Sequence, residues 1–409
     1  MTLVIGPFSQ ILTMDQIPSS GPISDRQLPI VKDSYISVSN GAIQAIGDSS
    51  LAQDPSVELC SLGRPMVLLP GFIDVHTHIC FAGSRARDYA LRLEGVSYQE
   101  IAAQGGGILD TVRKTRATPE TNLVDGIVHR SREALKWGVC TCEVKSGYGL
   151  SVEDELKILR SIAEAKKHSP INLIPTCLAA HMPGPEFVSA ESYLEEMLEK
   201  LLPLVKKEKL ANRVDIFVEE GAFSVEQARP YLLKAKEMGF KLTIHADQFS
   251  RGASLLAAEV GALSADHLEQ SNEEDFLALK EAGVIPVALP GASLGLGMPF
   301  SKARLALDLG LPLVIASDWN PGSAPMGDLL TQAALFGAAE KLSCAETLAA
   351  ITERAARALG SKHRGVLREG MRADFIAFPC DDYREILYQQ GRLRPSRAWI
   401  AGKEIKGIL

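Results

Sequence analysis

Four residues in this 409-residue chain have the types and positions that suit a metal ion. His76 and His78 end an apolar run, and the two-residue period of a strand would place both imidazoles on one face. His245 and Asp318 each close a further apolar run. Three neutral imidazoles and one carboxylate suit Zn²⁺, and also Fe²⁺ or Mn²⁺, and leave room for a water whose pKa the cation lowers towards about 7. The pattern predicts a metal-dependent hydrolase.

A fifth candidate, His267, follows another apolar run in the sequence Ser-Ala-Asp-His-Leu-Glu. A mononuclear site already has four ligands without it. We therefore expect His267 to polarise a substrate oxygen or to orient the water rather than to bind the metal.

Eight short apolar runs must position these side chains, and most of them alternate with stretches of helical period. The runs cover residues 66–74, 139–144, 171–178, 214–218, 241–244, 262–265, 284–289 and 313–316. The helical stretches include residues 152–167, 186–207, 225–238, 273–282 and 324–340. Eight such units predict an α/β protein with a (β/α)8 TIM barrel, whose catalytic residues lie at the carboxyl ends of its strands. An open doubly wound sheet is the alternative.

The two ends of the chain do not follow this alternation and instead contain short strand-like pieces at residues 35–38, 42–46, 374–377 and 398–400. We expect residues 1–68 and 365–409 to form one small β domain, and residues 69–364 to form the barrel.

Composition sets limits on the partners. Hydrophobic residues make up 46% of the chain and charged residues 23%, as in ordinary globular proteins, and the formal net charge is −7. This charge argues against a nucleic-acid partner.

The absence of a leader-like start or a long apolar run predicts a cytoplasmic protein with no membrane segment. The seven scattered cysteines are expected to be small buried hydrophobes, and a metal role for Cys140 and Cys142 is disfavoured because no second ligand pair stands nearby.

Several motifs resemble a known family. The segments PGFIDVHTH, IHADQ, SADHLE and SDWNPGS, in this order, resemble the amidohydrolase superfamily, as does the C-terminal segment VLREGMRADFIAF. The longer strings HTHICFAGSRARDYALRLEGVSYQEIAAQGGGI, EVKSGYGL, DIFVEEGAFS and DWNPGSAP are similar to the imidazolonepropionase family. The resemblance covers nearly the whole predicted barrel and the C-terminal piece.

The resemblance implies hydrolysis of 4-imidazolone-5-propanoate to N-formimidoyl-L-glutamate with one Zn²⁺ or Fe ion, on a distorted barrel joined to a small β-sandwich. The implied metal ligands agree with the four residues above. The implied substrate-binding residues are Arg85, Tyr98, Tyr148, His181, Gln248, Asn320, Gly322 and Ser323. A propanoate substrate suits Arg85, because an arginine can hold a carboxylate through two parallel hydrogen bonds. A homodimer is compatible with the sequence.

Gln248 departs from related deaminases, which have a proton-shuttling glutamate three residues after the strand-five histidine. An amide cannot act as a general base, so we assign proton transfer to Asp318 and His267 and hydrogen bonding to Gln248. A heterocycle deaminase is the nearest alternative, and a catalytically silent scaffold is a more distant one. Some amidohydrolases bridge two metals through a carboxylated lysine, but Lys145 follows the second run rather than the fourth. The segment ALPGASLGLGMP and the Ala179-Ala180-His181 turn also depart from the family pattern.

Overall fold

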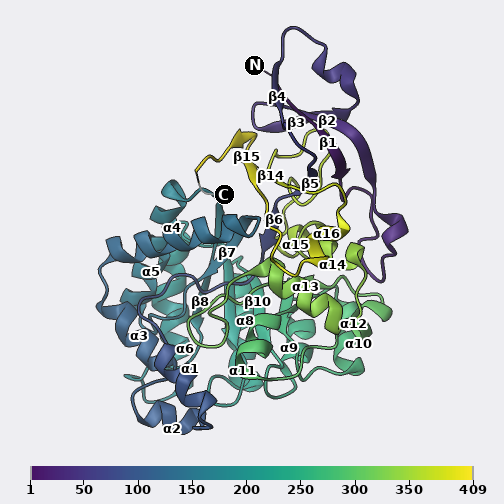
Figure 1. Ribbon diagram of the computed structural model, residues 1–409. Coiled ribbons are helices and arrows are strands. Elements are labelled where there is room, and N and C mark those ends of the chain that lie inside the picture. The colour runs from purple at the N-terminus through teal and green to yellow at the C-terminus, as the bar shows by residue number, and fades with distance from the viewer. Residues whose placement is uncertain (1, 408–409) are drawn as a thin grey trace.

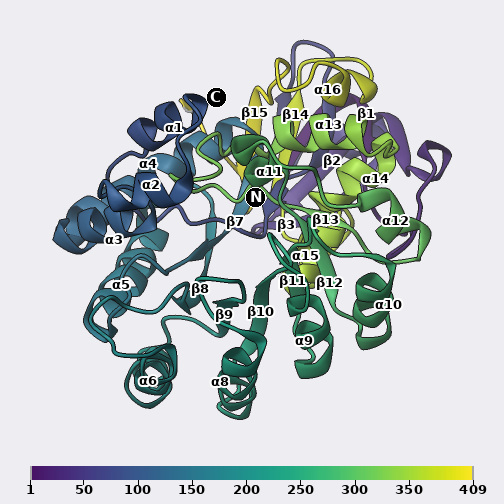
Figure 2. The same ribbon diagram turned by 90° about the horizontal axis from the view of Figure 1, so that it is seen from below.

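The computed structural model describes residues 2–407, apart from the side chains of Tyr98, Gln99 and Ala102. Eight parallel strands, hydrogen-bonded in chain order, form the predicted barrel (Figures 1 and 2). The strands are β6 Phe72–Asp74, β7 Val139–Lys145, β8 Asn172–Ala180, β9 Arg213–Phe217, β10 Lys241–Ala246, β11 Ser264–His267, β12 Ile285–Ala288 and β13 Val314–Ile315. Every predicted run overlaps one of these strands, so the predicted alternation of strands and helices is confirmed.

The barrel closes just beyond the carboxyl ends of its first and last strands. The segments after β6 and β13 lie side by side there, and Thr77 forms a parallel bridge with Trp319. The Asp318 amide donates to the His76 carbonyl at 3.1 Å, and the His78 amide donates to the Trp319 carbonyl at 2.9 Å. This closure brings three of the four predicted metal ligands together and excludes the open-sheet alternative.

Helices surround the barrel, as Figure 2 shows for α4, α5, α6, α8, α9 and α10. The helices that precede or alternate with the strands are α1 Ala86–Leu93, α2 Tyr98–Ala103, α3 Ile108–Ala117, α4 Glu120–Lys136, α5 Val152–His168, α6 Ala190–Glu196, α7 Leu202–Lys207, α8 Val225–Glu237, α9 Ala253–Val260, α10 Glu273–Ala282, α11 Pro290–Leu296 and α12 Ala303–Asp308. The helices that follow β13, the last strand of the barrel, are α13 Leu329–Ala339, α14 Cys344–Ala350, α15 Glu353–Ala358 and α16 Arg384–Tyr388.

Two predicted helices differ from the observed ones. The helix predicted at 186–207 begins only at Ala190, and it is divided into α6 and α7 by a π-helical turn over Met197–Leu201. The helix predicted at 324–340 begins only at Leu329, because the Asp328 side chain caps it by accepting from the Thr331 amide. The five residues before it remain a loop beside the metal ligands.

The two ends of the chain form a second sheet, seen as the purple and yellow strands at the top of Figure 1. Its strands are β1 Leu3–Leu12, β2 Ile30–Ser39, β3 Ala42–Gly47, β4 Glu58–Ser61, β5 Val67–Pro70, β14 Phe375–Phe378, β15 Arg397–Ile400 and β16 Lys403–Glu404, with short 3-10 turns at Asp25–Gln27 and Ser49–Ala52. Phe8, Ile36, Phe375 and Trp399 share a core that is separate from the barrel core, as in a small β-sandwich.

The apolar run at residues 66–74 serves both sheets. Its first half is β5, which pairs with β1 and β14, and its second half is β6 of the barrel. The predicted boundary at residue 69 therefore falls inside β5, and the chain changes sheets at Gly71. A Cβ atom at Gly71 would lie 2.3 Å from the sulfur of Cys140, so this crossing needs a glycine.

Within residues 2–407, no helix combines the length and the apolar character that crossing a bilayer requires.

Candidate metal centre

The four predicted ligands meet at the carboxyl end of the barrel, where every side chain is at most 3% exposed. His76 and His78 follow β6, His245 lies near the end of β10, and Asp318 follows β13. His78 Nε2 lies 3.2 Å from His76 Nε2 and 3.4 Å from His245 Nε2. Asp318 Oδ1 lies 3.3 Å from His78 Nε2 and 3.6 Å from His76 Nε2. Four donor atoms from three separate segments thus face one small space.

Four of the six distances between these donor atoms are those expected around one cation. Ligand bonds of about 2.0–2.1 Å imply roughly 3.3–3.4 Å between neighbouring donor atoms. The observed separations of 3.2–3.6 Å bracket that value. Nitrogen and carboxylate donors of this kind suit zinc. His76, His78 and Asp318 are therefore close enough together to hold a metal ion, and His245 adds a nitrogen beside His78.

Two buried carboxylates set the tautomers of two of the histidines. His76 Nδ1 lies 2.6 Å from Asp266 Oδ2, and His245 Nδ1 lies 3.1 Å from Asp215 Oδ1. A carboxylate accepts a hydrogen bond, so each Nδ1 carries the proton and each Nε2 presents a lone pair to the shared space. Neither carboxylate was predicted as part of the site. The sequence features that could have identified them are the position of Asp215 within an apolar strand and that of Asp266 directly before His267.

The histidines are held neutral, as metal ligands must be. Burial lowers the pKa of His78 to about 3 and that of His245 to about 4. Burial, with the nearby Lys145 charge, also places the pKa of His76 well below its ordinary value. Protons therefore compete weakly for these nitrogens near neutral pH.

Asp318 is oriented by the loop that follows it. The Asn320 side-chain amide donates to Asp318 Oδ2 at 2.9 Å, and the Ser323 hydroxyl donates to the same oxygen at 3.3 Å. Oδ1 is left to face the histidines. Burial raises the pKa of Asp318 although His267, His245 and Asn320 oppose the change. A carboxylate of raised pKa is better able to take up a proton.

His267 lies beside this cluster. Its donor atom is within 4.8 Å of those of His76 and His245, so these three histidines form a second group that could hold a metal. Its Nδ1 lies 3.7 Å from Glu269 Oε2. Burial alone would lower the pKa of His267, but Glu269 outweighs it with help from Asp318, and the pKa is raised. The position agrees with the predicted polarising role, which stays a prediction.

Arg85 is the predicted carboxylate anchor, and it precedes α1 with its side chain only 10% exposed. Its Nε is paired with Asp88, which also accepts from the Gly107 amide at 2.9 Å. A Cβ atom added to Gly322 would lie 3.5 Å from Arg85 Nη1, so the guanidinium reaches the loop that holds Asp318. The Gly322 amide donates to Asn320 Oδ1 at 2.8 Å. Arg85, Asn320, Gly322 and Ser323 are therefore brought together at the metal centre.

Tyr148 and His181 form a wall beside His78. The His181 ring stacks on His78 with centroids 5.2 Å apart, and Tyr148 lies 5.5 Å from His181. Burial lowers the pKa of His181 well below its ordinary value, so the ring is neutral. Gln248 is buried two residues beyond β10. The Tyr98 side chain lies outside the described residues, and its substrate contact stays a prediction.

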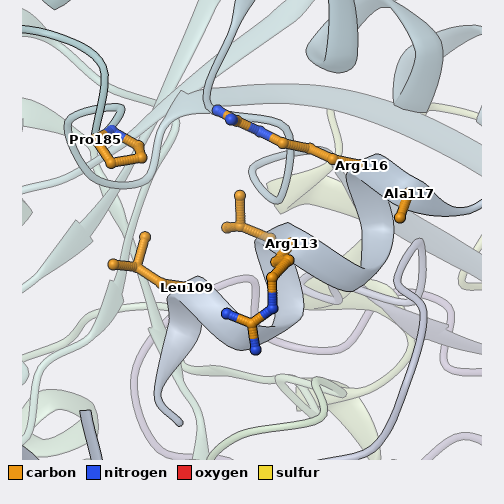
Figure 3. A pocket seen from close by; sticks show the side chains of 6 residues that line it. Leu109, Arg113, Arg116, Ala117 and Pro185 are labelled. Atoms are coloured by element: carbon orange, nitrogen blue, oxygen red, sulfur yellow. The ribbon is translucent and has the colours of Figure 1, made fainter. Parts of the chain in front are cut away.

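A separate surface hollow of about 490 Å³ lies between α3 and the loop after β8 (Figure 3). Leu109, Arg113, Arg116 and Pro185 line it, and none of the metal-centre residues does. The Arg116 guanidinium is already bound to Glu186 and to the Gly149 carbonyl. The Arg116 side chain is therefore not available to bind an anion in this hollow. The hollow has no role in the proposed chemistry.

Known proteins resemble this chain in sequence and in fold. The amidohydrolase family matches residues 67–405. An imidazolonepropionase of Solibacter usitatus (strain Ellin6076) is 41% identical over 395 residues, which cover 94% of each chain. One from Rubrobacter xylanophilus (strain DSM 9941 / JCM 11954 / NBRC 16129 / PRD-1) is 42% identical over 381 residues, or 91% of each chain.

Two solved structures resemble the fold at low sequence identity. A zinc-bound adenosine deaminase from Xanthomonas campestris has a TM-score of 0.71 at 18% identity and covers 98% of this chain and 92% of its own. A zinc complex of mutant atrazine chlorohydrolase from Arthrobacter aurescens TC1 has a TM-score of 0.68 at 17% identity and covers 98% of this chain and 94% of its own. Together with the sequence matches, the barrel and its histidine cluster show that this chain belongs to the imidazolonepropionases of the amidohydrolase family.

Proposed function

We propose that this chain hydrolyses the ring amide of 4-imidazolone-5-propanoate to N-formimidoyl-L-glutamate, one water being consumed for each C–N bond broken. The observation that carries the proposal is that a nitrogen of His76, a nitrogen of His245 and an oxygen of Asp318 all lie 3.2–3.4 Å from His78 Nε2. Family membership identifies the substrate, and the site supplies the chemistry.

His76, His78, His245 and Asp318 would hold a single zinc ion. A bound zinc ion supplies Lewis acidity, which polarises a carbonyl and makes water acidic near neutral pH. The donor set also accepts iron. Metal analysis of the purified protein distinguishes the two.

Asp318 moves the proton in this proposal. Its Oδ1 faces the histidines while Oδ2 is held by Asn320 and Ser323, so the carboxylate keeps one orientation during turnover. It takes the proton of the attacking water and returns a proton to the ring nitrogen that leaves. The raised pKa of this buried carboxyl favours the first transfer, the uptake of the proton from water. His267 stabilises the negative charge that develops on the carbonyl oxygen.

Arg85 orients the substrate. Asp88 fixes its Nε edge, and its Nη edge is directed toward Gly322. A propanoate bound to that edge places the ring beside the neutral His181 and Tyr148 rings. Cyclic amides without an acid tail would leave the guanidinium without an anionic partner. The enzyme should therefore select cyclic amides that carry a carboxylate.

Gln248 separates this proposal from deamination. A deaminase needs a carboxylate that carries a proton to the leaving amine, and an amide at this position cannot do so. We assign Gln248 to hydrogen bonding with the substrate or product.

The experiment follows the ultraviolet absorbance of 4-imidazolone-5-propanoate with zinc-loaded and zinc-stripped protein, and identifies the product by mass. Conversion is expected only with metal, and His78→Ala should abolish it. His168→Ala is the matched control, because His168 is 59% exposed on the outside of the barrel. No metal-dependent ring opening would overturn the proposal, and ammonia release from an aminated ring would identify a deaminase instead.

A further inference from the structure

Lys145, the last residue of β7, is fully buried directly beneath the metal centre. Its Nζ lies 2.7 Å from Asp215 Oδ2, 2.9 Å from Glu143 Oε1 and 4.0 Å from Asp266 Oδ2. A lysine without solvent is retained only where carboxylates compensate its charge. Here three carboxylates from three different strands surround one ammonium group.

Two of these three carboxylates are the ones that hold metal-centre histidines. Asp215 contacts His245 Nδ1 at 3.1 Å through its other oxygen, and Asp266 contacts His76 Nδ1 at 2.6 Å through the oxygen nearest Lys145. One ammonium group therefore joins two carboxylate and histidine pairs. The two histidines are 169 positions apart in the chain, and Lys145 is the common point of their support.

We propose that Lys145 is a positioning residue that fixes the Nδ1 partners of His76 and His245, so that both Nε2 atoms stay directed at the metal. The inference rests on the metal site proposed above but not on the identity of the substrate.

The charge pattern explains why the lysine is needed. If the ammonium of Lys145 were removed, the buried carboxylates of Glu143, Asp215 and Asp266 would lose the cation that lies between them, and their mutual repulsion would displace them. A displaced carboxylate no longer accepts the Nδ1 hydrogen in a fixed direction. The rings then lose the orientation that the metal requires, and outer partners of this kind change metal affinity by about 10- to 100-fold.

The same contacts argue against a second metal bridged by this lysine. Burial would lower the pKa of Lys145, but Asp215, Glu143 and Asp266 outweigh it and raise the pKa. The nitrogen is thus held as an ammonium between acceptors. Its lone pair is not available to form a carbamate.

The test compares three variants by zinc affinity, measured in competition with a chromophoric chelator. Lys145→Met removes the ammonium. Lys145→Met combined with Glu143→Gln removes one positive and one negative charge, and keeps the core balanced if the single variant fails to fold. Lys157→Met is the matched control, because it removes an ammonium on α5 that contacts the Arg116 carbonyl and Asp154 instead of this cluster. Thermal unfolding of each zinc-free protein monitors the fold, and the visible spectrum of the Co²⁺ form monitors ligand geometry.

Both variants that lack Lys145 are expected to bind zinc about 10- to 100-fold more weakly, with an altered Co²⁺ spectrum, whereas Lys157→Met stays close to wild type. Wild-type affinity and spectrum in a folded variant without the lysine would overturn the inference. If the wild type binds zinc but does not open the imidazolone ring, the proposed reaction fails and the role of Lys145 stands. If the wild type binds no zinc, the metal site and this inference fail together.

Discussion

The Asn320 side-chain amide donates to Asp318 Oδ2 at 2.9 Å and also to the Asp318 carbonyl at 2.7 Å. The same side chain accepts through Oδ1 from the Gly322 and Ser323 amides at 2.8 Å. Asn320 therefore connects the proposed base to the loop that faces Arg85. It was expected to contact the substrate, and the structure adds a role in holding Asp318.

Asn320→Ala is expected to lower kcat about 10- to 100-fold, because Asp318 loses the donor that orients it. Asn320→Asp should cost more, since a second carboxylate would repel Asp318. Steady-state kinetics on the imidazolone measure both, with Asn122→Ala on the exposed face of α4 as the control. Unchanged kcat in Asn320→Ala would show that Asp318 does not depend on this contact.

The convergence of the four ligands could be predicted because each ligand lies at the carboxyl end of an apolar run, which is visible in the sequence. A parallel barrel brings the carboxyl ends of all strands to one rim, so His76, His78, His245 and Asp318 had to converge once the eight runs were identified. The alternation of strands and helices needed nothing beyond periodicity.

The support beneath the ligands could not be predicted in the same way. Asp215 meets His245 because β9 and β10 pair with Asp215 opposite Thr243, and the sequence does not give this register. The contacts of Lys145 with strands β9 and β11 have the same origin. The sequence showed that Lys145 was an unlikely metal bridge, but only the packed barrel shows the three carboxylates around it.

Arg85→Met should remove the preference for an acid tail. Wild type is expected to lose about 10- to 150-fold in kcat/KM when the propanoate is replaced by a neutral propanamide, because charge-assisted hydrogen bonds contribute about 1.5–3 kcal/mol. The variant should treat both compounds alike. Arg87→Met, on an exposed residue of α1, is the control. A variant that still prefers the acid would place the carboxylate elsewhere.

Zinc should stabilise the fold through the histidine cluster. Binding only to the native state adds about 2.7 kcal/mol at a free zinc concentration one hundred times the Kd. Calorimetry of stripped protein should therefore show a Tm that rises with added zinc, and His245→Ala should show a much smaller rise. A zinc-dependent rise of equal size in His245→Ala would mean that the ion binds at another site.

We expect the zinc-free wild type and the zinc-free Asp74→Asn variant to differ in stability by an amount that depends on pH. The buried carboxyl of Asp74 accepts from the Ser317 amide at 3.0 Å, and burial raises its pKa from the ordinary range of an aspartate to about 7. The native state holds this proton more tightly than the unfolded chain, so its contribution is fully present below the unfolded pKa and is lost as pH rises towards 7.

Asp74→Asn mimics the neutral carboxyl at every pH. The free energy of unfolding of the variant relative to wild type should therefore increase between pH 4 and pH 7, by on the order of a few kcal/mol at about 1.4 kcal/mol per pKa unit. Urea unfolding at several pH values measures the difference, and groups that titrate in both proteins cancel from it. A difference that is constant with pH would mean that Asp74 is ionised in the native state throughout this range.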